Sequence, residues 1–517
     1  MILLPALAGI LLPLVKSKQN KHLVTTITLA LEAMLAFIVL FSPERESVLF
    51  SMTDSLTVTL GVDKVSKLFV AIASFGFLLV GIYAYQYLNH EENDDKFFSF
   101  FLLSLAALVG MDFSRNLITM YLFFEMITLL SMPLHPLALE RTGEMVEVPM
   151  SDVVAKLKLA DTAQIVVLDA DGQQVPYQVT YDEKVIFPAT VKANGTATYT
   201  IQPGAPEAFN VIACGKYYPE RLDDLAWEND LVGFRAYGPA LQARNERGFG
   251  YDLFTKYNTT EPILEALYAE ELNPEKRAKI AELKKTDPKA AAELQRAISY
   301  HVDHGYGMDC YAVGPTLGCG TSALMEGDTI VYPYCYRTQE ILDNGPLRFT
   351  VKLEFNPLVV RGDSGVVETR VISLDAGSYL NKAVISYTNL KETMPVATGL
   401  VLREPDGVTM ADAANGYITY VDPTTDRSGG NGKIFVGAAF PAQVKDAKVV
   451  LFQEKEKKER GGADGHVLAV SEYEPGSEYT YYWGSAWDKA AIKTAEAWNE
   501  YMSQYAQKVR TPLTVAY

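Results

Sequence analysis

Five apolar stretches occupy the first 134 residues of this 517-residue chain, and no stretch of comparable length follows them. A helix needs roughly 20 apolar residues to cross a bilayer, because its backbone groups must be satisfied internally there. The sequence therefore predicts a front part that folds in lipid and a remainder that folds in water. The five stretches are Met1–Val15, Leu23–Phe41, Val65–Leu88, Phe97–Met111 and Asn116–Leu134.

The charges between these stretches predict how they cross the membrane. Lys16, Lys18 and Lys21 cluster after the first stretch, and positively charged turns stay in the cytoplasm. We therefore predict a multi-pass segment with its N-terminus outside and the chain after Leu134 in the cytoplasm. The first stretch is short and lacks the basic leader and cleavage site of a signal peptide, so it is interpreted as a short or tilted span, with an uncleaved anchor as the alternative.

Two carboxylates, Glu32 and Glu125, lie inside the apolar stretches. A charge near the centre of a bilayer costs several kcal/mol, so both are candidates for ion translocation. For Glu32 the alternative is a protonated side chain that faces a neighbouring helix.

The last of the five stretches resembles the fifth helix of the antiporter-like subunits of respiratory complex I and of multisubunit sodium–proton antiporters. The resemblance rests on Arg115-Asn-Leu-Ile-Thr-Met-Tyr-Leu-Phe-Phe-Glu125-Met-Ile-Thr-Leu-Leu-Ser-Met-Pro-Leu134, on the order of the spans and on the Ser66–Leu88 helix. It implies that Glu125 pairs with a lysine on a later helix and that other subunits pack against this part. The later helices are missing here, so we expect no ion conduction, which needs a continuous chain of titratable groups.

After Leu134 the hydrophobic pattern changes to short alternating runs, which are typical of strands. Met145–Gln202 is interpreted as a small β-sandwich, with a hairpin turn at Asp171-Gly172. From Phe209 to Tyr482 the strands are longer and rich in aromatic residues, which suggests a large antiparallel sandwich.

Two helical segments interrupt this β-rich part. Pro274–Ala297 has helical spacing with Asp287-Pro288 at its middle and predicts an inserted helical hairpin, and Asp488–Val509 predicts an amphipathic terminal helix with Trp498 on its apolar face. The predicted fold class is thus mixed, with about five transmembrane helices followed by all-β domains. The predicted domains are residues 1–134, 135–203 and 204–517.

Charge and cysteine content exclude several kinds of partner. The net charge is −17, of which −14 lies after Leu134, and an acidic body of this kind repels nucleic acid. The four cysteines form no CxxC pair and have no histidine at zinc spacing, so we predict no metal and no cofactor. A disulfide is compatible with this part only if it is exported. Asp422–Gly432 is interpreted as a turn, with calcium binding as the alternative.

The first candidate site is a dense run of charged and aromatic residues. Aromatic faces stack on sugar rings and carboxylates bind hydroxyl groups, so this composition suits a sugar site; the alternative is a solvated loop with one buried tryptophan. The candidates are Glu228, Asp230 and Arg235 for catalysis and Trp227, Asn229 and Tyr237 for substrate binding.

The second candidate site lies between His301 and Asp309. A histidine beside carboxylates and a tyrosine is suited to acid–base transfer near neutral pH, although a purely structural role is the alternative. The candidates are Asp303, His304 and Tyr306 for catalysis and His301 and Asp309 for binding.

The third candidate site is the run from Tyr481 to Asp488. Trp483 and Trp487 are predicted to stack on a sugar, and ordinary core packing is the alternative.

The chain after Leu134 also resembles a secreted family of unknown function that is encoded beside bacterial polysaccharide-degrading enzymes. The resemblance rests on His135-Pro-Leu-Ala-Leu-Glu-Arg141, Trp227-Glu-Asn-Asp230 through Tyr237-Gly-Pro239, Tyr300-His-Val-Asp-His-Gly305 and Trp483-Gly-Ser-Ala-Trp487. It implies a supersandwich similar to that of galactose mutarotases and several polysaccharide lyases.

These resemblances predict a carbohydrate-active protein that acts on acidic or unsaturated sugars. In a lyase, Arg235 or Asn229 would offset the substrate carboxylate while Tyr306 or His304 takes the proton. In a hydrolase or mutarotase, His304 and a carboxylate would share the acid and base roles. The alternative is a non-catalytic glycan-binding module on a membrane anchor. Because a membrane family ends where an exported one begins, we hypothesise that two unrelated genes were joined near Leu134.

Overall fold

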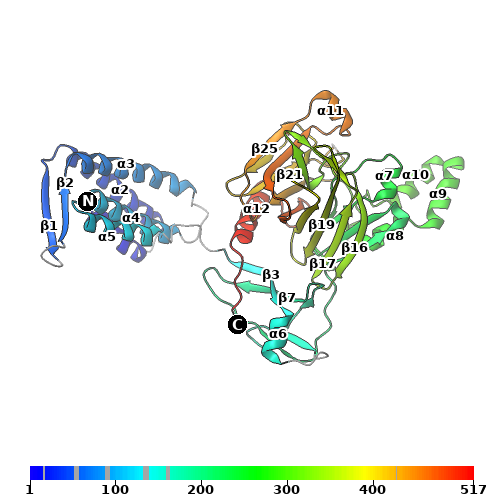
Figure 1. Ribbon diagram of the computed structural model, residues 1–517, viewed down its shortest axis with the longest axis horizontal. Helices are drawn as coiled ribbons and strands as arrows, with labels where there is room; N and C mark the ends of the chain where they lie inside the picture. Colours follow the sequence, from blue (N-terminus) through cyan, green and yellow to red (C-terminus); the bar gives the residue numbers. More distant parts are fainter. Residues whose placement is uncertain are drawn as a thin grey trace. The chain divides into compact units, whose positions relative to one another are not determined.

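The computed structural model describes residues 1–15, 18–51, 57–87, 94–131, 139–158, 164–426 and 428–516. The chain divides into two compact units, Met1–Ala138 and Leu139–Tyr517 (Figure 1). The predicted boundary at Leu134, the first lysine of the predicted cytoplasmic turn and most of the loop between the third and fourth stretches lie outside the described residues.

The first unit contains five α-helices, one in each predicted apolar stretch, and a β-hairpin. The helices are α1 (Leu3–Leu11, continued by the 3-10 turn Leu12–Leu14), α2 (Lys18–Leu40), α3 (Lys64–Tyr87), α4 (Asp94–Asp112) and α5 (Leu117–Ser131), and the hairpin pairs β1 (Arg45–Ser51) with β2 (Thr57–Val62). Within the described residues, two segments are long and apolar enough to cross a membrane, Asn20–Leu40 and Lys64–Ala84. The other three apolar helices are shorter, so the five-span topology and its orientation remain predictions.

The two carboxylates of the apolar stretches differ in burial. Glu32 on α2 is fully buried, and its carboxylate oxygens have no hydrogen-bond partner among the described residues. Glu125 lies on an exposed side of α5. An ion-translocating role for either residue remains a prediction.

The second unit begins with two small three-stranded sheets around a shared core. One has the order β3 (Arg141–Pro149), β7 (Lys184–Val191), β6 (Gln178–Val179), and the other β5 (Gln174–Val175), β4 (Ile165–Leu168), β8 (Thr200–Pro203). Val148, Val167 and Phe187 fill the core between them, and α6 (Met150–Leu157) adds Val153. The predicted hairpin is confirmed, because β4 pairs with β5 across the turn that holds Asp171 and Gly172, whose φ is +77°.

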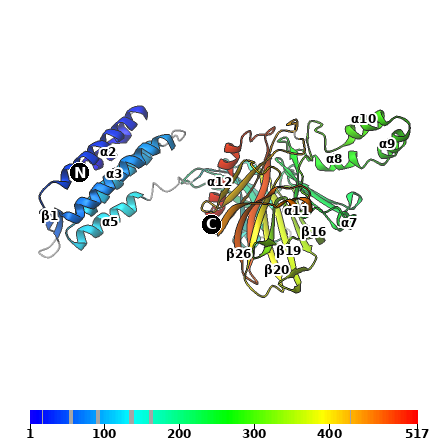
Figure 2. The same cartoon turned by 90° about the horizontal axis from the view of Figure 1, so that it is seen from above.

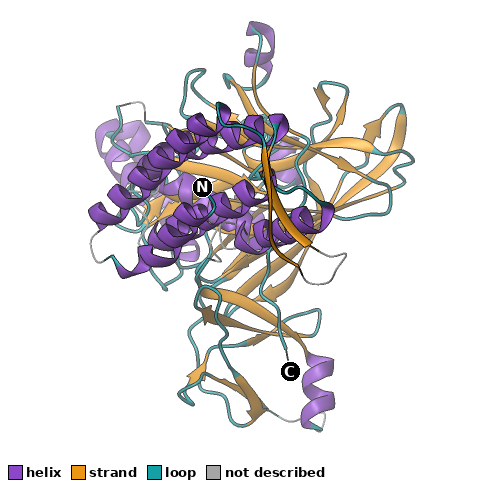
Figure 3. Ribbon diagram, turned by 90° about the vertical axis from the view of Figure 1, so that its left-hand side faces the viewer, coloured by secondary structure: helices purple, strands orange, loops and turns teal. Residues whose placement is uncertain are grey.

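Three larger antiparallel sheets follow, and this unit contains more strand than helix (Figure 3). The nine-stranded sheet has the order β16 (Tyr336–Asn344), β17 (Arg348–Phe355), β19 (Asp363–Asp375), β20 (Leu380–Thr388), β27 (Tyr479–Trp487), β24 (Ile434–Ala439), β23 (Tyr417–Asp422), β22 (Thr409–Asp412), with β18 (Leu358–Val360) paired to β19. A five-stranded sheet has the order β15 (Thr329–Ile330), β14 (Cys319–Glu326), β21 (Met394–Leu402), β26 (Gly465–Tyr473), β25 (Asp446–Leu451). The other has the order β13 (Gly307–Met308), β12 (Asp252–Lys256), β11 (Gly233–Ala236), β10 (Asp224–Glu228), β9 (Cys214–Tyr218).

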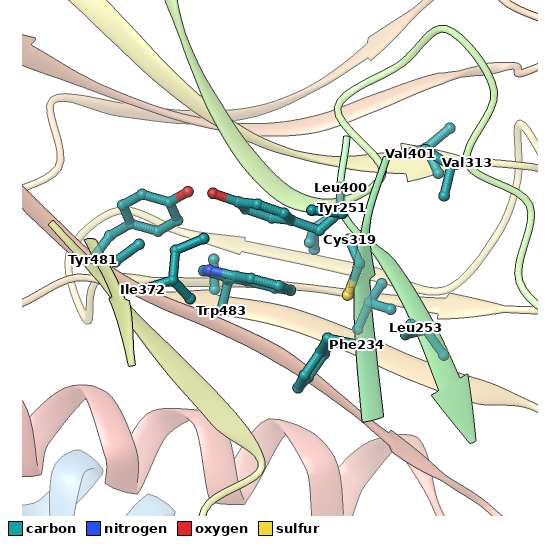
Figure 4. Close-up of a cluster of buried hydrophobic side chains, with 14 of the residues drawn as sticks. Phe234, Tyr251, Leu253, Val313, Cys319, Ile372, Leu400, Val401, Tyr481 and Trp483 are labelled. Carbon is teal, nitrogen blue, oxygen red and sulfur yellow. The ribbon is translucent and has the colours of Figure 1, made fainter. Parts of the chain in front are cut away.

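One hydrophobic core joins these three sheets. Alternate residues of β19 are buried, as expected for a strand with one face on a core. Tyr251 stacks on Trp483 at 4.0 Å between ring centroids, with Phe234 and Cys319 beside them (Figure 4). The four cysteines are free thiols.

The predicted helical hairpin is confirmed as α9 (Pro274–Thr286) and α10 (Pro288–Ile298), which project from the sheets together with α8 (Leu264–Glu271) (Figure 2). Asp287 ends α9 and caps α10, because its side chain accepts a hydrogen bond from the Ala290 amide. The terminal helix α12 runs over Ala495–Arg510, so the predicted start at Asp488 is wrong. The Thr494 side chain caps this helix and sets its first turn.

Candidate functional site

The first predicted site folds into a closed ion network around Arg235. The Arg235 side chain is 3% exposed and contacts Asp252 and Asp309, the latter at 2.6 Å, with Asp224 at 3.6 Å. Burial raises the pKa of Asp224 to about 6, although Arg235 acts in the opposite direction. Tyr237 is part of the same network, because its hydroxyl donates to Asp252. Arg235 is therefore enclosed by protein groups that occupy its guanidinium nitrogens.

Glu228 and Asn229, two other candidates of the first predicted site, also make contacts within the protein. Glu228 accepts hydrogen bonds from the Ile263 and Leu264 amides at the start of α8 and pairs with buried Lys256 at 2.7 Å. Asn229 Nδ2 donates to the carbonyl oxygens of Asp375 (2.6 Å) and Ser378 (2.7 Å).

Asn229 Oδ1 accepts from the amides of Leu231 and Val232, so the full hydrogen-bonding capacity of this amide is used. Asp230 Oδ1 accepts from the Gly377 amide at 2.8 Å. Asn229 and Asp230 thus fasten the turn between β19 and β20.

The predicted stacking residues lie inside the protein. Trp227 and Trp483 are fully buried, and Trp487 is nearly so. Trp227 Nε1 donates to Asn381 Oδ1 at 2.8 Å, and Trp487 Nε1 donates to the Asn431 carbonyl at 2.8 Å. Their alternative interpretation, core packing, describes this structure, because no indole face is open to a ligand.

The second predicted site lies partly at the surface. His301 Nδ1 is 3.0 Å from the Asp309 carbonyl oxygen and 3.5 Å from Asp309 Oδ2, and the His301 side chain is 57% exposed. His304 Nε2 lies 3.1 Å from the Ser299 carbonyl oxygen. Asp303 accepts from the Tyr257 hydroxyl at 2.9 Å, and Tyr306 is exposed.

A cavity of about 460 Å³ lies elsewhere in the second unit, between the large sheet, the small β3 sheet and α12. Its floor is one face of the large sheet, and in Figure 1 the C-terminal end of α12 (red) runs toward β3 (cyan). Tyr501, Gln504, Tyr505 and Lys508 line one wall, because positions three and four apart share a helix face.

Cross-strand pairing aligns the side chains of the cavity floor. Lys382 on β20 lies between Ser373 on β19 and Tyr482 on β27 in the sheet register. Asp375 follows Ser373 by two residues on β19, and it lies opposite Arg348 on β17. All five residues line the cavity, because residues two apart on a strand share a face.

The carboxylates of the cavity wall are held in ion pairs. Arg348 binds Asp375 through two nitrogens, at 2.5 and 2.9 Å, and Glu147 at 2.6 Å, while Glu144 pairs with Arg141 at 2.9 Å. Burial acts to raise the pKa of Glu147, but Arg348 and Lys184 outweigh it and hold that pKa at about 2. Burial also raises the pKa of Tyr482 to about 12.

Sequence reasoning did not find this cavity. None of the predicted site residues lines it, although Asn229 and Asp230 fasten the turn from Asp375 to Ser378, which does. The spacing of Tyr501, Tyr505 and Lys508 in the sequence indicates that they share one face of a helix. Their partners on the strands are far apart in the chain and carry no shared motif.

Comparisons with known proteins give relatives for most of the chain. The "Uncharacterized protein P7" of Formosa agariphila is 24% identical over 387 residues, which cover 72% of this chain and 86% of that protein. The chloroplastic NAD(P)H-quinone oxidoreductase subunit 5 of Zygnema circumcarinatum is 27% identical over 111 residues, which cover 21% of this chain and 16% of that subunit.

Solved structures give weaker likenesses. An alpha-mannosidase from Enterococcus faecalis V583 matches 83% of this chain and 54% of its own, with 10% identity and a TM-score of 0.36. A TPR-domain containing protein from Parabacteroides distasonis ATCC 8503 matches 67% of this chain and 56% of its own, with 9% identity and a TM-score of 0.26. This chain thus spans about half of each, and at these TM-scores neither carries an argument about fold or function.

The family model described as "Domain of unknown function (DUF4861)" matches residues 134–515, which include the small and large sheets, α12 and the cavity between them. The chain belongs to this family.

Proposed function

We propose that the β-rich unit is a carbohydrate-active protein and that its sugar site is the cavity beside α12. The observation that supports this proposal is the lining of the cavity, in which Tyr482, Tyr501 and Tyr505 lie beside charged groups. Ligand sites typically enclose 300 to about 1,000 Å³ and combine aromatic surface with a few polar groups, and tyrosine suits the mixed faces of a sugar.

The state of the carboxylates favours sugar binding over glycoside hydrolysis in this cavity. A hydrolase of the usual type needs one carboxyl group with a raised pKa as the proton donor. Glu147 has the opposite shift, to about 2, and Asp375 and Glu144 are occupied by arginines. A glycan-binding module, the alternative function considered from the sequence, fits these contacts.

Catalysis is the second candidate function, and the position of His301 favours it. A carbonyl oxygen only accepts hydrogen bonds, so the short contact to Asp309 assigns the Nδ1 proton and leaves Nε2 as the acceptor. Nε2 of this exposed, oriented imidazole is the atom that could accept a proton from a substrate. His304 Nε2 lies against the Ser299 carbonyl, whereas His301 Nδ1 also lies 3.5 Å from the Asp309 carboxylate, which can orient the ring, and for this reason we propose His301 as the base of a lyase-type reaction.

A panel of neutral and acidic plant and algal glycans tests both functions on the full chain in detergent. Binding is measured by calorimetry, and elimination by the ultraviolet absorbance of an unsaturated product. We expect binding to at least one glycan; if His301→Ala abolishes turnover while His304→Ala retains it, the catalytic candidate is supported. If no glycan on the panel binds or is converted, the carbohydrate proposal fails.

For the front unit we propose a truncated, non-conducting piece of a proton-translocating subunit, joined to an unrelated gene. The partial match to the oxidoreductase subunit and the apolar helices support this origin. Proton flux in liposomes that contain the full chain would contradict it. Sequencing of the locus with long reads tests the junction: two separate reading frames would identify it as an assembly error, and one continuous transcript would identify it as a fusion.

A further inference from the structure

Two lysines line the cavity without an ion pair or hydrogen bond in the described part of the chain. Lys382 rises from the sheet floor and Lys508 from the last turn of α12. Neither ammonium group has a hydrogen bond or an ion pair within the described part of the chain, whereas Arg348 in the same wall has two carboxylate partners. Both side chains are only partly exposed, so each ammonium is less hydrated than on an open surface.

The cavity wall and its ion pairs leave one positive charge unbalanced. Glu144 pairs with Arg141, and Arg348 is shared by Glu147 and Asp375, so three carboxylates face two arginines and the two lysines. Burial lowers the pKa of Lys508. The charge of Glu144 raises this pKa, and the charge of Arg141 lowers it further. A negative group beside Lys508 would offset both effects.

We infer that Lys382 and Lys508 form an anion-binding subsite of this cavity, and that the ligand is a sugar that carries a carboxylate or a sulfate ester. This inference rests on the proposed carbohydrate function and narrows it to anionic sugars. Charged donors bind anionic oxygens more strongly than they bind neutral hydroxyls. The Tyr482 ring, next to Lys382 in the sheet register, is placed to contact the sugar ring that carries the anion.

Calorimetry with the full chain in detergent micelles tests the subsite. The probes are trigalacturonate, its methyl ester, in which each carboxylate becomes a neutral ester, and a sulfated galactan trisaccharide. We expect one of the two anionic probes to bind at least about tenfold more tightly than the neutral ester, which corresponds to roughly 1.4 kcal/mol. Which anionic probe binds identifies the source of the charge.

Variants assign this preference to the two lysines. Lys382→Ala and Lys508→Ala should each weaken the affinity for the anionic probe about tenfold and leave the affinity for the ester unchanged. Lys382→Arg and Lys508→Arg keep the positive charge, so they should retain most of the affinity for the anionic probe. Lys445→Ala is the matched control, because Lys445 is an exposed lysine in an ion pair with Glu472. Equal affinities for acid and ester, with no effect of either lysine, would overturn the subsite but keep the sugar site. Absence of binding by all three probes would also overturn the subsite, and the sugar site itself would fall only if no glycan of the wider panel bound.

Discussion

Arg235 and Arg348 are each held between carboxylates, and Arg348 lines the cavity beside α12. Around Arg235, three aspartates and three tyrosines close the network under α8, and the side chain is 3% exposed. The Arg348 side chain is 11% exposed, and two lysines that line the same cavity have no ion pair or hydrogen bond among the residues that the structure describes. The same chemical groups therefore form a structural network in one place and a candidate binding surface in the other, and access to solvent distinguishes them.

The largest effect is expected from removal of the buried arginine. Arg235→Ala leaves Asp252 and Asp309 as unpaired buried charges, and breaking such a network costs about 3–5 kcal/mol of unfolding free energy. Tryptophan fluorescence during urea unfolding reports on the β-rich unit alone, because all four tryptophans lie in it. The control is Arg337→Ala, since Arg337 is 48% exposed and pairs with Glu354 on the surface, where an ion pair contributes about 0–1 kcal/mol. Equal losses in the two variants would refute the buried-network account.

The second prediction concerns Asp224, whose folded pKa of about 6 lies above its ordinary value of 3.8. Folding favours the protonated form, so this group stabilises the fold fully below pH 3.8, and the stabilisation is lost as the pH rises through 6. The shift of about two pKa units corresponds to roughly 3 kcal/mol. Asp224→Asn should therefore gain stability relative to the parent between pH 4 and 6 in urea unfolding. A constant difference over that range would show that Asp224 does not titrate there.

The third prediction is the opposite pH dependence at the cavity. The folded pKa of Glu147, about 2, lies below its ordinary value of 4.5. Its ionised form stabilises the fold above pH 4.5, and this contribution is lost as the pH falls toward 2, with a total of about 2–3 kcal/mol. Glu147→Gln should be less stable than the parent at pH 6, and the difference should shrink below pH 4.5. If the difference grew on acidification, the ion pairs to Arg348 and Lys184 would be excluded as its cause.

A smaller loss of stability is expected from Asn229→Ala, because Asn229 lies between the Arg235 network and the cavity beside α12. Asn229→Ala removes the donors that hold the carbonyl oxygens of Asp375 and Ser378, and a buried polar group left unpaired costs about 1–3 kcal/mol. Because this turn lines the cavity, the variant should also weaken sugar binding in calorimetry. Unchanged affinity in a folded variant would separate the turn from the binding site.

The sequence indicated the secondary structure well where local patterns decide it. Asp171-Gly172 predicted the hairpin, and Asp287-Pro288 predicted the break between α9 and α10. The start of α12 was missed, because the threonine cap at Thr494 is weaker evidence in a sequence than the aromatic run before it.

The candidate site was less predictable, because burial depends on tertiary packing. Trp227, Asn229 and Arg235 suit sugar chemistry by residue type, but β11 and α8 enclose Arg235 and the core encloses Trp227. The cavity instead combines Glu147, Lys382 and Lys508, which lie more than 100 residues from one another. Only the strand order brings them together.

The central claim is that the cavity beside α12, and not the surface around His301, holds an acidic sugar. A crystal structure of residues 135–517 with trigalacturonate or the sulfated trisaccharide, whichever binds, tests it most directly. We predict density for the sugar between the large sheet and α12, with its anionic group within hydrogen-bonding distance of Lys382 or Lys508. Density at His301 and Tyr306 with an empty cavity would contradict the claim.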